Sequence, residues 1–305
     1  MKTLKRSLVA ALAGIALAQG IAPAAADNFD SPEILVLGDS QLPFGSGPAF
    51  VEFFSDLAAS CNATATQALE LKKLGESRVA AIGVRSTSLP TWLTRSRKGK
   101  SALCDVDPKW NVNAGAFGVI NTSENKYVQI GRGEAYQFCE PNQSAFETMF
   151  RADYYTPKLT LMTFLGNSTT RWANSVDAAI EDVDRLNAQL PDGMGCIFMT
   201  TQPAYKSKIV ERRKRAQDHL EFAFEVTGSQ CSFVPGATEA TIASHQGNAS
   251  FFRRRANGTV KDPFHPNLKA AMAFFDLERD AICSAVLEQT TRIPAMEEMT
   301  AQILP

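Results

Sequence analysis

Two short segments far apart in the chain carry the residue types of a nucleophilic hydrolase. Ser40 ends the run Gly38-Asp39-Ser40, directly after an apolar stretch. His265 follows Asp262 by three residues and precedes Pro266. A serine hydroxyl is a weak nucleophile until a base takes its proton, and a carboxylate on the far ring nitrogen orients that base. The two segments therefore predict a Ser-His-Asp triad and ester hydrolysis, if folding brings them together.

The sequence offers three histidines as candidates for the base. His219 lies in a strongly charged helical segment, which is typical of a solvated surface. His245 lies in a polar loop beside Gln246-Gly247-Asn248 and stays a minor alternative. His265 has Asp262 at a spacing that lets the carboxylate face its ring. We predict that His265 is the general base.

Acyl transfer also requires hydrogen-bond donors at the developing oxyanion. Gly83 follows the apolar run 79–82, and Asn167 follows the apolar run 159–165. A backbone amide and a side-chain amide at two strand ends are suitable donors. Each residue, taken singly, is also an ordinary turn residue. We predict that the Gly83 amide and the Asn167 side chain flank the ester oxygen.

The elements that must position these groups alternate along the chain. Short apolar runs bounded by turn residues predict five strands, at 34–37, 79–84, 159–165, 196–200 and 231–234. Helical spacing predicts helices at 48–60, 172–190, 207–226 and 267–287. Almost continuously apolar strands that alternate with helices indicate a parallel sheet covered on both faces. The predicted fold class is therefore α/β, a three-layer α/β/α sandwich whose functional groups gather at the carboxyl ends of the strands.

The N-terminal residues have the pattern of a removable export signal. Lys2, Lys5 and Arg6 precede an apolar stretch, and Ala24-Ala25-Ala26 resembles a cleavage site. We predict a signal peptide at 1–26, a single domain at 27–305 with an insertion at about 85–155, and a periplasmic or secreted location. No later apolar run has membrane length, so no membrane insertion is predicted.

Charge and cysteine usage exclude several classes of function. Residues 1–26 carry three basic and no acidic side chains, which leaves 28 basic and 32 acidic side chains and a formal charge of −4. This balance argues against nucleic acid as a partner. The six cysteines permit disulfides in an exported chain, with Cys104–Cys139 and Cys196–Cys231 as candidate pairs. Neither a C-x-x-C pair nor an H-E-x-x-H motif is present, so we predict no metal and no cofactor.

The order and placement of Ser40, Gly83, Asn167 and His265 resemble the four marker residues of the SGNH/GDSL hydrolase family. The resemblance spans about residues 34–287. It implies a flavodoxin-like fold, Ser40 as nucleophile, His265 as general base and Asp262 as its orienting residue. It also implies the oxyanion hole of Ser40, Gly83 and Asn167.

Two positions depart from the family pattern. Gln41 follows the nucleophile, where the family usually has leucine. The third block reads Leu165-Gly166-Asn167-Ser168, where the family usually has Gly-x-Asn-Asp. The Gly-x-Ser-x-Gly elbow of α/β-hydrolases is absent around Ser40.

The export signal and the family resemblance together suggest acyl groups on carbohydrate, such as O-acetyl esters of a polysaccharide, as the substrate. The residues that we predict to contact it are Arg85, Ser86, Trp92, Gln202, Tyr205 and the arginines 253–255, with Arg253 the first of these. The basic residues 212–215 fall on a predicted helix and are predicted to be surface. Two alternatives stay open: an O-acyltransferase acting on a glycan, and a glycan-binding protein without catalysis on a hydrolase fold.

Overall fold

The computed structural model describes residues 32–75, 78–84, 87–95, 116–118, 128–130, 141–150 and 155–292. The predicted signal peptide and the proposed pair Cys104–Cys139 lie outside these residues. The strands are β1 (Ile34–Gly38), β2 (Val79–Gly83), β3 (Ala116–Gly118), β4 (Val128–Ile130), β5 (Leu159–Thr163), β6 (Gly195–Met199) and β7 (Ser232–Val234).

Within the described residues these strands form one sheet in the order β4-β3-β2-β1-β5-β6-β7. The five strands predicted from the sequence, β2, β1, β5, β6 and β7, are parallel. The short strands β3 and β4 come from the predicted insertion. β3 pairs antiparallel with β2, and β4 pairs antiparallel with β3 at the edge of the sheet. The predicted parallel sheet is confirmed, and strands from the predicted insertion widen it at one edge.

The helices are α1 (Gly47–Ser55), α2 (Leu57–Ser60), α3 (Ala65–Leu71), α4 (Leu89–Leu93), α5 (Ala145–Met149), α6 (Thr169–Asn174), α7 (Val176–Asn187), α8 (Ser207–Val226), α9 (Glu239–His245), α10 (Leu268–Leu277) and α11 (Arg279–Arg292). Three short turns of other helical types join them: η1 (Leu42–Ser46), η2 (Lys72–Leu74) and η3 (Ala249–Phe251). Three predicted helices are each divided in two: 48–60 at Asp56, 172–190 at Ser175 and 267–287 at Glu278. At Ser175 the backbone is extended, and the side-chain oxygen accepts a hydrogen bond from the Ala178 amide, which begins α7.

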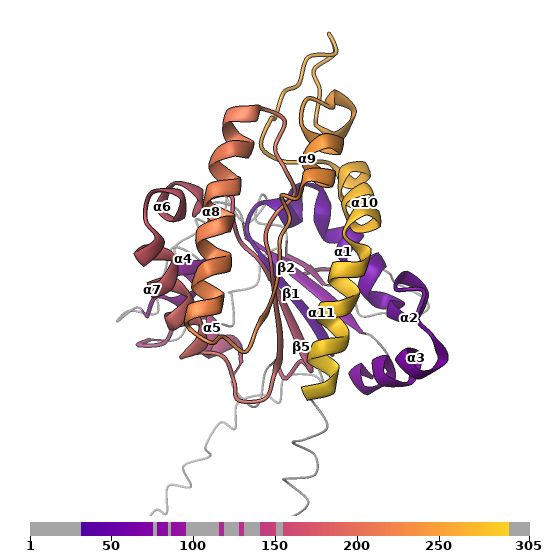
Figure 1. Ribbon diagram of the computed structural model, residues 1–305, viewed down its shortest axis with the longest axis vertical. Helices are drawn as coiled ribbons and strands as arrows, with labels where there is room; N and C mark the ends of the chain where they lie inside the picture. The colour runs from indigo at the N-terminus through magenta and orange to yellow at the C-terminus, as the bar shows by residue number, and fades with distance from the viewer. Residues whose placement is uncertain are drawn as a thin grey trace, which may run out of the picture. The chain divides into compact units, whose positions relative to one another are not determined.

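The helices cover both faces of the sheet, which confirms the three-layer sandwich (Figure 1). Alternate residues of β1 point to opposite sides, as the two-residue period of a strand requires. Leu35 and Leu37 belong to a core with buried residues of α6, α7 and α8, whereas Ile34 and Val36 belong to a core with α1, α10 and α11. Burial on both faces explains the continuous apolar strands of the sequence.

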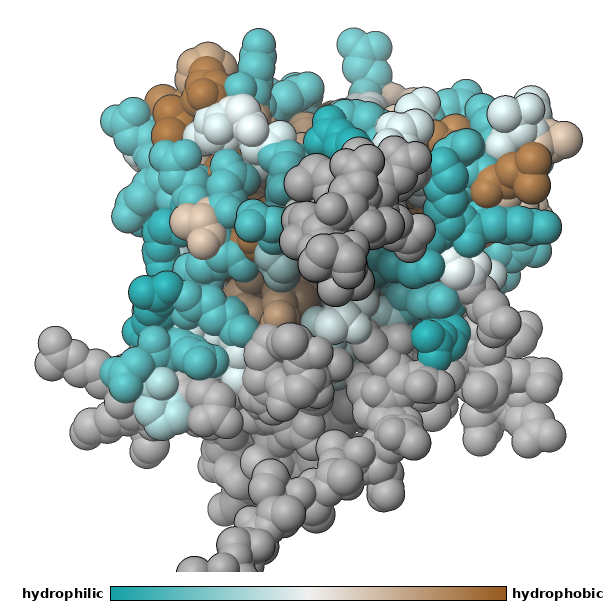
Figure 2. Space-filling view, turned by 90° about the horizontal axis from the view of Figure 1, so that it is seen from below, coloured by the Kyte–Doolittle hydropathy of each residue, from teal (hydrophilic) through white to brown (hydrophobic). Residues whose placement is uncertain are grey.

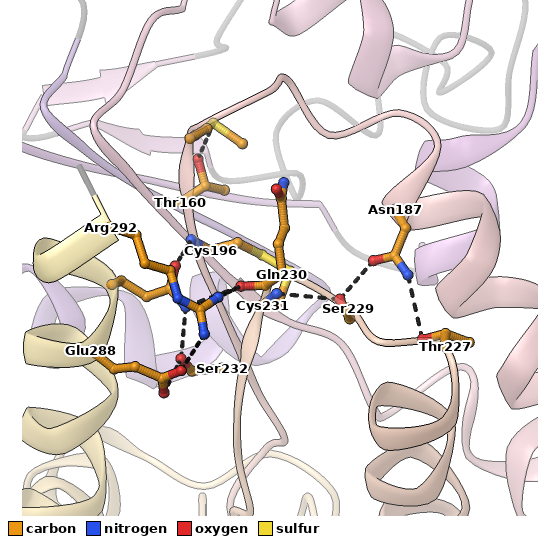
Figure 3. The surroundings of a disulfide bond; sticks show 12 residues. Thr160, Asn187, Cys196, Thr227, Ser229, Gln230, Cys231, Ser232, Glu288 and Arg292 are labelled. Carbon is orange, nitrogen blue, oxygen red and sulfur yellow. Dashed lines mark hydrogen bonds and ion pairs between the residues drawn. A yellow bond between two sulfur atoms is a disulfide. The ribbon is translucent and has the colours of Figure 1, made fainter. Parts of the chain in front are cut away.

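Two disulfides tie the ends of elements together within the described residues. Cys196–Cys231 joins the beginning of β6 to the residue before β7, as the sequence suggested. Asn187 of α7 accepts a hydrogen bond from Ser229, and Arg292 of α11 donates to the Gln230 carbonyl, so helices of both layers hold this corner (Figure 3). Cys61–Cys283 links the end of α2 to α11 and was not predicted.

The described surface opposite the carboxyl ends of the strands is mostly hydrophilic. Seen from below, its hydrophobic residues form small separate groups (Figure 2). Among the described residues, no helix combines the length and the apolar character that a bilayer crossing needs.

Candidate active site

The turn after β1 carries Ser40 at the carboxyl edge of the sheet. Gly38 pairs with Gly83 of β2 on one side and with Thr163 of β5 on the other. The Asp39 carboxylate accepts a hydrogen bond from the Gln41 amide over 2.9 Å, which turns the chain sharply out of the sheet. Ser40 is only 8% exposed in this turn. Its position is therefore fixed by the end of a central strand and by an aspartate-capped turn.

The loop before α10 folds around the Asp262 carboxylate. One carboxylate oxygen accepts hydrogen bonds from the backbone amides of Phe264 and His265, over 3.0 and 3.2 Å. The other lies 2.7 Å from Nδ1 of the His265 ring. The three-residue spacing thus lets one side chain close the loop and orient the ring at the same time.

The hydroxyl of Ser40 lies 2.9 Å from Nε2 of His265. An ionised carboxylate only accepts hydrogen bonds, so the ring carries its proton on Nδ1, toward Asp262. Nε2 is then the acceptor for the serine proton. The ring of Phe44 packs on the imidazole with centroids 4.3 Å apart and further restricts its orientation. The structure brings Ser40, His265 and Asp262 together in the order of a hydrolytic triad.

The surroundings of Asp262 stabilise its negative charge. Burial alone raises the pKa of this carboxyl group, but hydrogen bonds from the His265 ring and from the Phe264 amide, with attraction to His265, hold the pKa below its ordinary value. Asp262 is therefore a carboxylate wherever the protein is folded at neutral pH, which suits a residue that orients a histidine.

Gly83 ends β2 directly beside the nucleophile turn. A Cβ atom at this position would lie 2.5 Å from Leu42 Cβ and 2.5 Å from Pro43 Cδ, so only glycine allows the turn to pack this close. The strand register places Gly83 opposite Gly38, two residues before Ser40. This is the edge at which an oxyanion donor is needed.

Asn167 follows β5 at the same edge of the sheet and is exposed. Its side-chain amide donates to the Thr87 carbonyl over 2.7 Å. A primary amide has two N–H groups, so this hydrogen bond fixes the side chain and leaves a second N–H to donate. The role of Asn167 as an oxyanion donor stays a prediction.

The sequence matches no protein-family model and no curated protein. Among solved structures, it is similar to a DUF4886 family protein from Bacteroides uniformis, with 11% identity, a TM-score of 0.43 and coverage of 88% of this chain and 95% of that one. A proposed SGNH hydrolase from Slackia heliotrinireducens matches with 13% identity, a TM-score of 0.36 and coverage of 84% and 99%. A family two carbohydrate esterase from Clostridium thermocellum in complex with cellohexaose matches with 10% identity, a TM-score of 0.36 and coverage of 83% and 65%.

The residues that were predicted to contact the substrate differ in how far the structure exposes them. Trp92 is fully buried, donates to Thr87 and packs on Phe164, so the prediction that it contacts the substrate is wrong. Gln202 is 5% exposed, and its backbone carbonyl accepts a hydrogen bond from Arg213. Arg253 is exposed. Arg85 and Ser86 lie outside the described residues.

The rings of the other two histidines lie close to backbone carbonyls. His245 is fully buried, and its two ring nitrogens each lie 3.0 Å from a backbone carbonyl, of Thr241 and of Ala270. His219 is partly buried, and its Nδ1 lies 2.6 Å from the Trp172 carbonyl. Neither ring contacts Ser40. Among the described residues, no group of three or more His, Cys, Asp or Glu is placed to hold a metal ion.

Sequence reasoning missed Arg213, which was predicted to be on the surface. It is 3% exposed, and its guanidinium donates to the backbone carbonyls of Gln202 and Phe264 over 3.2 Å each. The signal was present in the helical period, because Arg213 lies four residues after Ile209 and seven before Leu220, which are both buried. This period was overlooked because the residues on either side of Arg213 are also basic.

The sequence also did not predict a separate role for Asp39, which directly precedes Ser40. It is fully buried, and burial raises the pKa of its carboxyl group. The hydrogen bond from the Gln41 amide and electrostatic attraction to Arg213 and His265 act in the opposite direction. Asp39 and Arg213 are thus two buried titratable groups that interact electrostatically next to Ser40.

Proposed function

We propose that this protein is an exported serine esterase of the SGNH type that removes short acyl groups, chiefly O-acetyl, from carbohydrate. The observation that carries the proposal is the arrangement of three side chains. The Ser40 hydroxyl is 2.9 Å from one nitrogen of His265, and the Asp262 carboxylate is 2.7 Å from the other. Two disulfides among the described residues support an oxidising location, periplasmic or secreted.

In the proposed reaction, His265 Nε2 takes the proton of Ser40 as the serine oxygen attacks the ester carbonyl carbon. The amides of Ser40 and Gly83 and the side chain of Asn167 stabilise the negative oxygen that forms. Collapse of this intermediate expels the sugar oxygen, which takes the proton from His265 and leaves an acyl-serine. Water then loses a proton to His265, attacks the acyl carbon and releases the carboxylic acid and Ser40. The reaction uses only side chains of this chain and water.

A basic hairpin next to the triad supports an anionic glycan as the acyl carrier. We define it as residues 253–261, where Arg254 bridges to Val260 and the Arg255 amide donates to Thr259 over 2.8 Å. Its four cationic side chains, Arg253, Arg254, Arg255 and Lys261, are exposed. In Figure 1 it belongs to the light orange segment that projects beyond α9.

The base of this hairpin is the triad loop itself. The Arg253 carbonyl accepts hydrogen bonds from the amides of Lys261 and Asp262, over 2.7 and 3.4 Å. A carboxylate-bearing polysaccharide held by these cations would therefore lie close to Ser40. Replacing the three arginines by glutamine should raise KM on an acetylated anionic glycan and leave KM on a small neutral ester unchanged.

The decisive test of the function uses a fluorophosphonate probe and acetylated polysaccharides. We expect the probe to label wild-type protein at Ser40 and not Ser40→Ala. Wild-type protein should release acetate without an added acceptor, and Ser40→Ala should lower kcat by at least about 10⁴-fold. Acetate transfer that requires an acceptor would identify an acyltransferase. A folded protein that is neither labelled nor active would instead be a binding protein.

A further inference from the structure

The backbone carbonyl of Phe264, the residue before the triad histidine, is held from two sides. Gln41 donates to it through its side-chain amide over 3.2 Å, and Arg213 donates through its guanidinium over 3.2 Å. Gln41 is the residue after Ser40 and is 5% exposed. One buried donor therefore comes from the nucleophile turn, and the other comes from helix α8.

A shift of the Phe264 carbonyl would also move His265, because the two residues share a peptide bond. The Phe264 amide is bound to the Asp262 carboxylate, and the preceding Pro263 carbonyl accepts from the Tyr205 amide over 2.9 Å. With the amide and the carbonyl of Phe264 both fixed, the peptide that enters His265 has little freedom to rotate. The distance between the Ser40 oxygen and the imidazole then depends on these contacts.

The groups that attract the positive charge of Arg213 lie in the same region of the protein. Burial lowers the pKa of Arg213 to about 10, and attraction to Asp39 and Asp262 opposes this decrease. The side chain is therefore charged at neutral pH. A buried guanidinium requires both hydrogen-bond acceptors and negative charge nearby. The acceptors of Arg213 are the Gln202 and Phe264 carbonyls, and its electrostatic partners are Asp39 in the nucleophile turn and Asp262 in the triad loop. It links the two segments electrostatically as well as through the shared carbonyl.

We propose that Gln41 and Arg213 are positioning residues, which both donate to the Phe264 carbonyl and so fix the His265 ring against the Ser40 hydroxyl. This inference rests on the proposed esterase function, because its effect on rate acts through His265. It also gives Gln41 a reason to replace the leucine that the family usually has there. A leucine cannot donate a hydrogen bond to this carbonyl.

The first experiment compares Arg213→Met and Arg213→Lys with Arg215→Met, a change of an exposed arginine on the same helix. We expect Arg213→Met to lower kcat on a short acyl ester by about 10- to 100-fold with KM within about twofold of wild type, because a misplaced catalytic group loses this much. Arg213→Lys should restore part of the loss, since it keeps the charge. Arg215→Met should retain wild-type kcat.

A second variant covers the case in which Arg213→Met does not fold. Gln41→Leu removes one donor without leaving a buried charge unpaired and should lower kcat by several-fold. In the double variant Gln41→Leu/Arg213→Met, the combined loss should be smaller than the product of the single losses, because both side chains act on one carbonyl. Wild-type kcat in folded Gln41→Leu and Arg213→Met proteins would overturn the proposal.

A measurement without turnover separates this inference from the proposed function. The proton on His265 Nδ1, which faces Asp262, should give a low-field proton NMR signal in wild type and Arg215→Met. Arg213→Met should broaden or abolish it. If the wild-type protein is neither labelled by a phosphonate nor active, the esterase proposal fails. If the wild type is active but the signal and kcat of folded Arg213→Met are unchanged, the positioning role alone fails.

Discussion

The side-chain amide of Asn167 donates to the backbone carbonyl of Thr87 over 2.7 Å. Thr87 follows β2 and Asn167 follows β5, and these two strands pair on either side of β1. The hydrogen bond thus connects the segments that flank the exit of β1 toward Ser40. It provides a fixed amide at the edge of the sheet where the proposed ester carbonyl must lie.

Asn167→Ala should lower kcat about 10²- to 10³-fold, because an oxyanion donor acts chiefly in the transition state. KM should change little. Steady-state kinetics on a short acyl ester measures both, with Asn174→Ala, an exposed position at the end of α6, as the matched control. A kcat within tenfold of wild type would remove Asn167 from the oxyanion hole.

Asp262→Asn should lower kcat about 10⁴-fold while the protein stays folded, because an amide no longer selects the histidine tautomer that has its proton on Nδ1. Asp192→Asn, at an exposed loop position, should have no effect on kcat. The rates are measured at saturating ester. Equal activity of the two variants would show that the Asp262 carboxylate does not orient the base.

The same carboxylate makes stability depend on pH. Its pKa in the folded protein lies below the ordinary value of 3.8, so the folded state favours the charged form. This contribution is complete above the unfolded-state pKa and is lost as the pH falls through the folded-state pKa. Urea unfolding at pH 7, 5, 4 and 3 should therefore show a stability gap between wild type and Asp262→Asn that is constant down to about pH 4 and smaller below. A gap that widens in acid would contradict this sign.

Gly83→Ala should destabilise the fold by about 1–3 kcal/mol, as overpacking does in tight interiors. The new methyl group would lie 2.5 Å from atoms of Leu42 and Pro43 and must displace the turn that carries Ser40. The melting temperature and kcat should both fall. Unchanged values of both would mean that the turn can move away at no cost to the site.

The triad and the sheet were accessible to sequence reasoning for a physical reason. Each strand is short, apolar and bounded by turn residues, and parallel strands present their carboxyl ends at one edge. Ser40 follows one such end. The Asp262 and His265 pair is local in sequence, so its contact depends on one loop.

The parts that sequence did not predict depend on contacts between distant segments. Arg213 donates to a carbonyl of a loop about fifty residues further along the chain. The helical period indicates that Arg213 faces inward, but it does not identify this partner. A tryptophan is more often a core residue than a platform for a sugar, and Trp92 is fully buried in the structure. The division of one predicted helix into α6 and α7 follows from the cap at Ser175, which a capping analysis could have found.

The bond between Cys61 and Cys283 closes a ring of the chain that contains Gly83, Asn167, Asp262 and His265 but leaves Ser40 outside. A protease that nicks the backbone once anywhere inside this ring releases no fragment, because the two pieces remain covalently joined. In the exported esterase that we propose, a single cut would therefore leave Ser40 covalently linked to the segment that carries His265 until the disulfide is reduced.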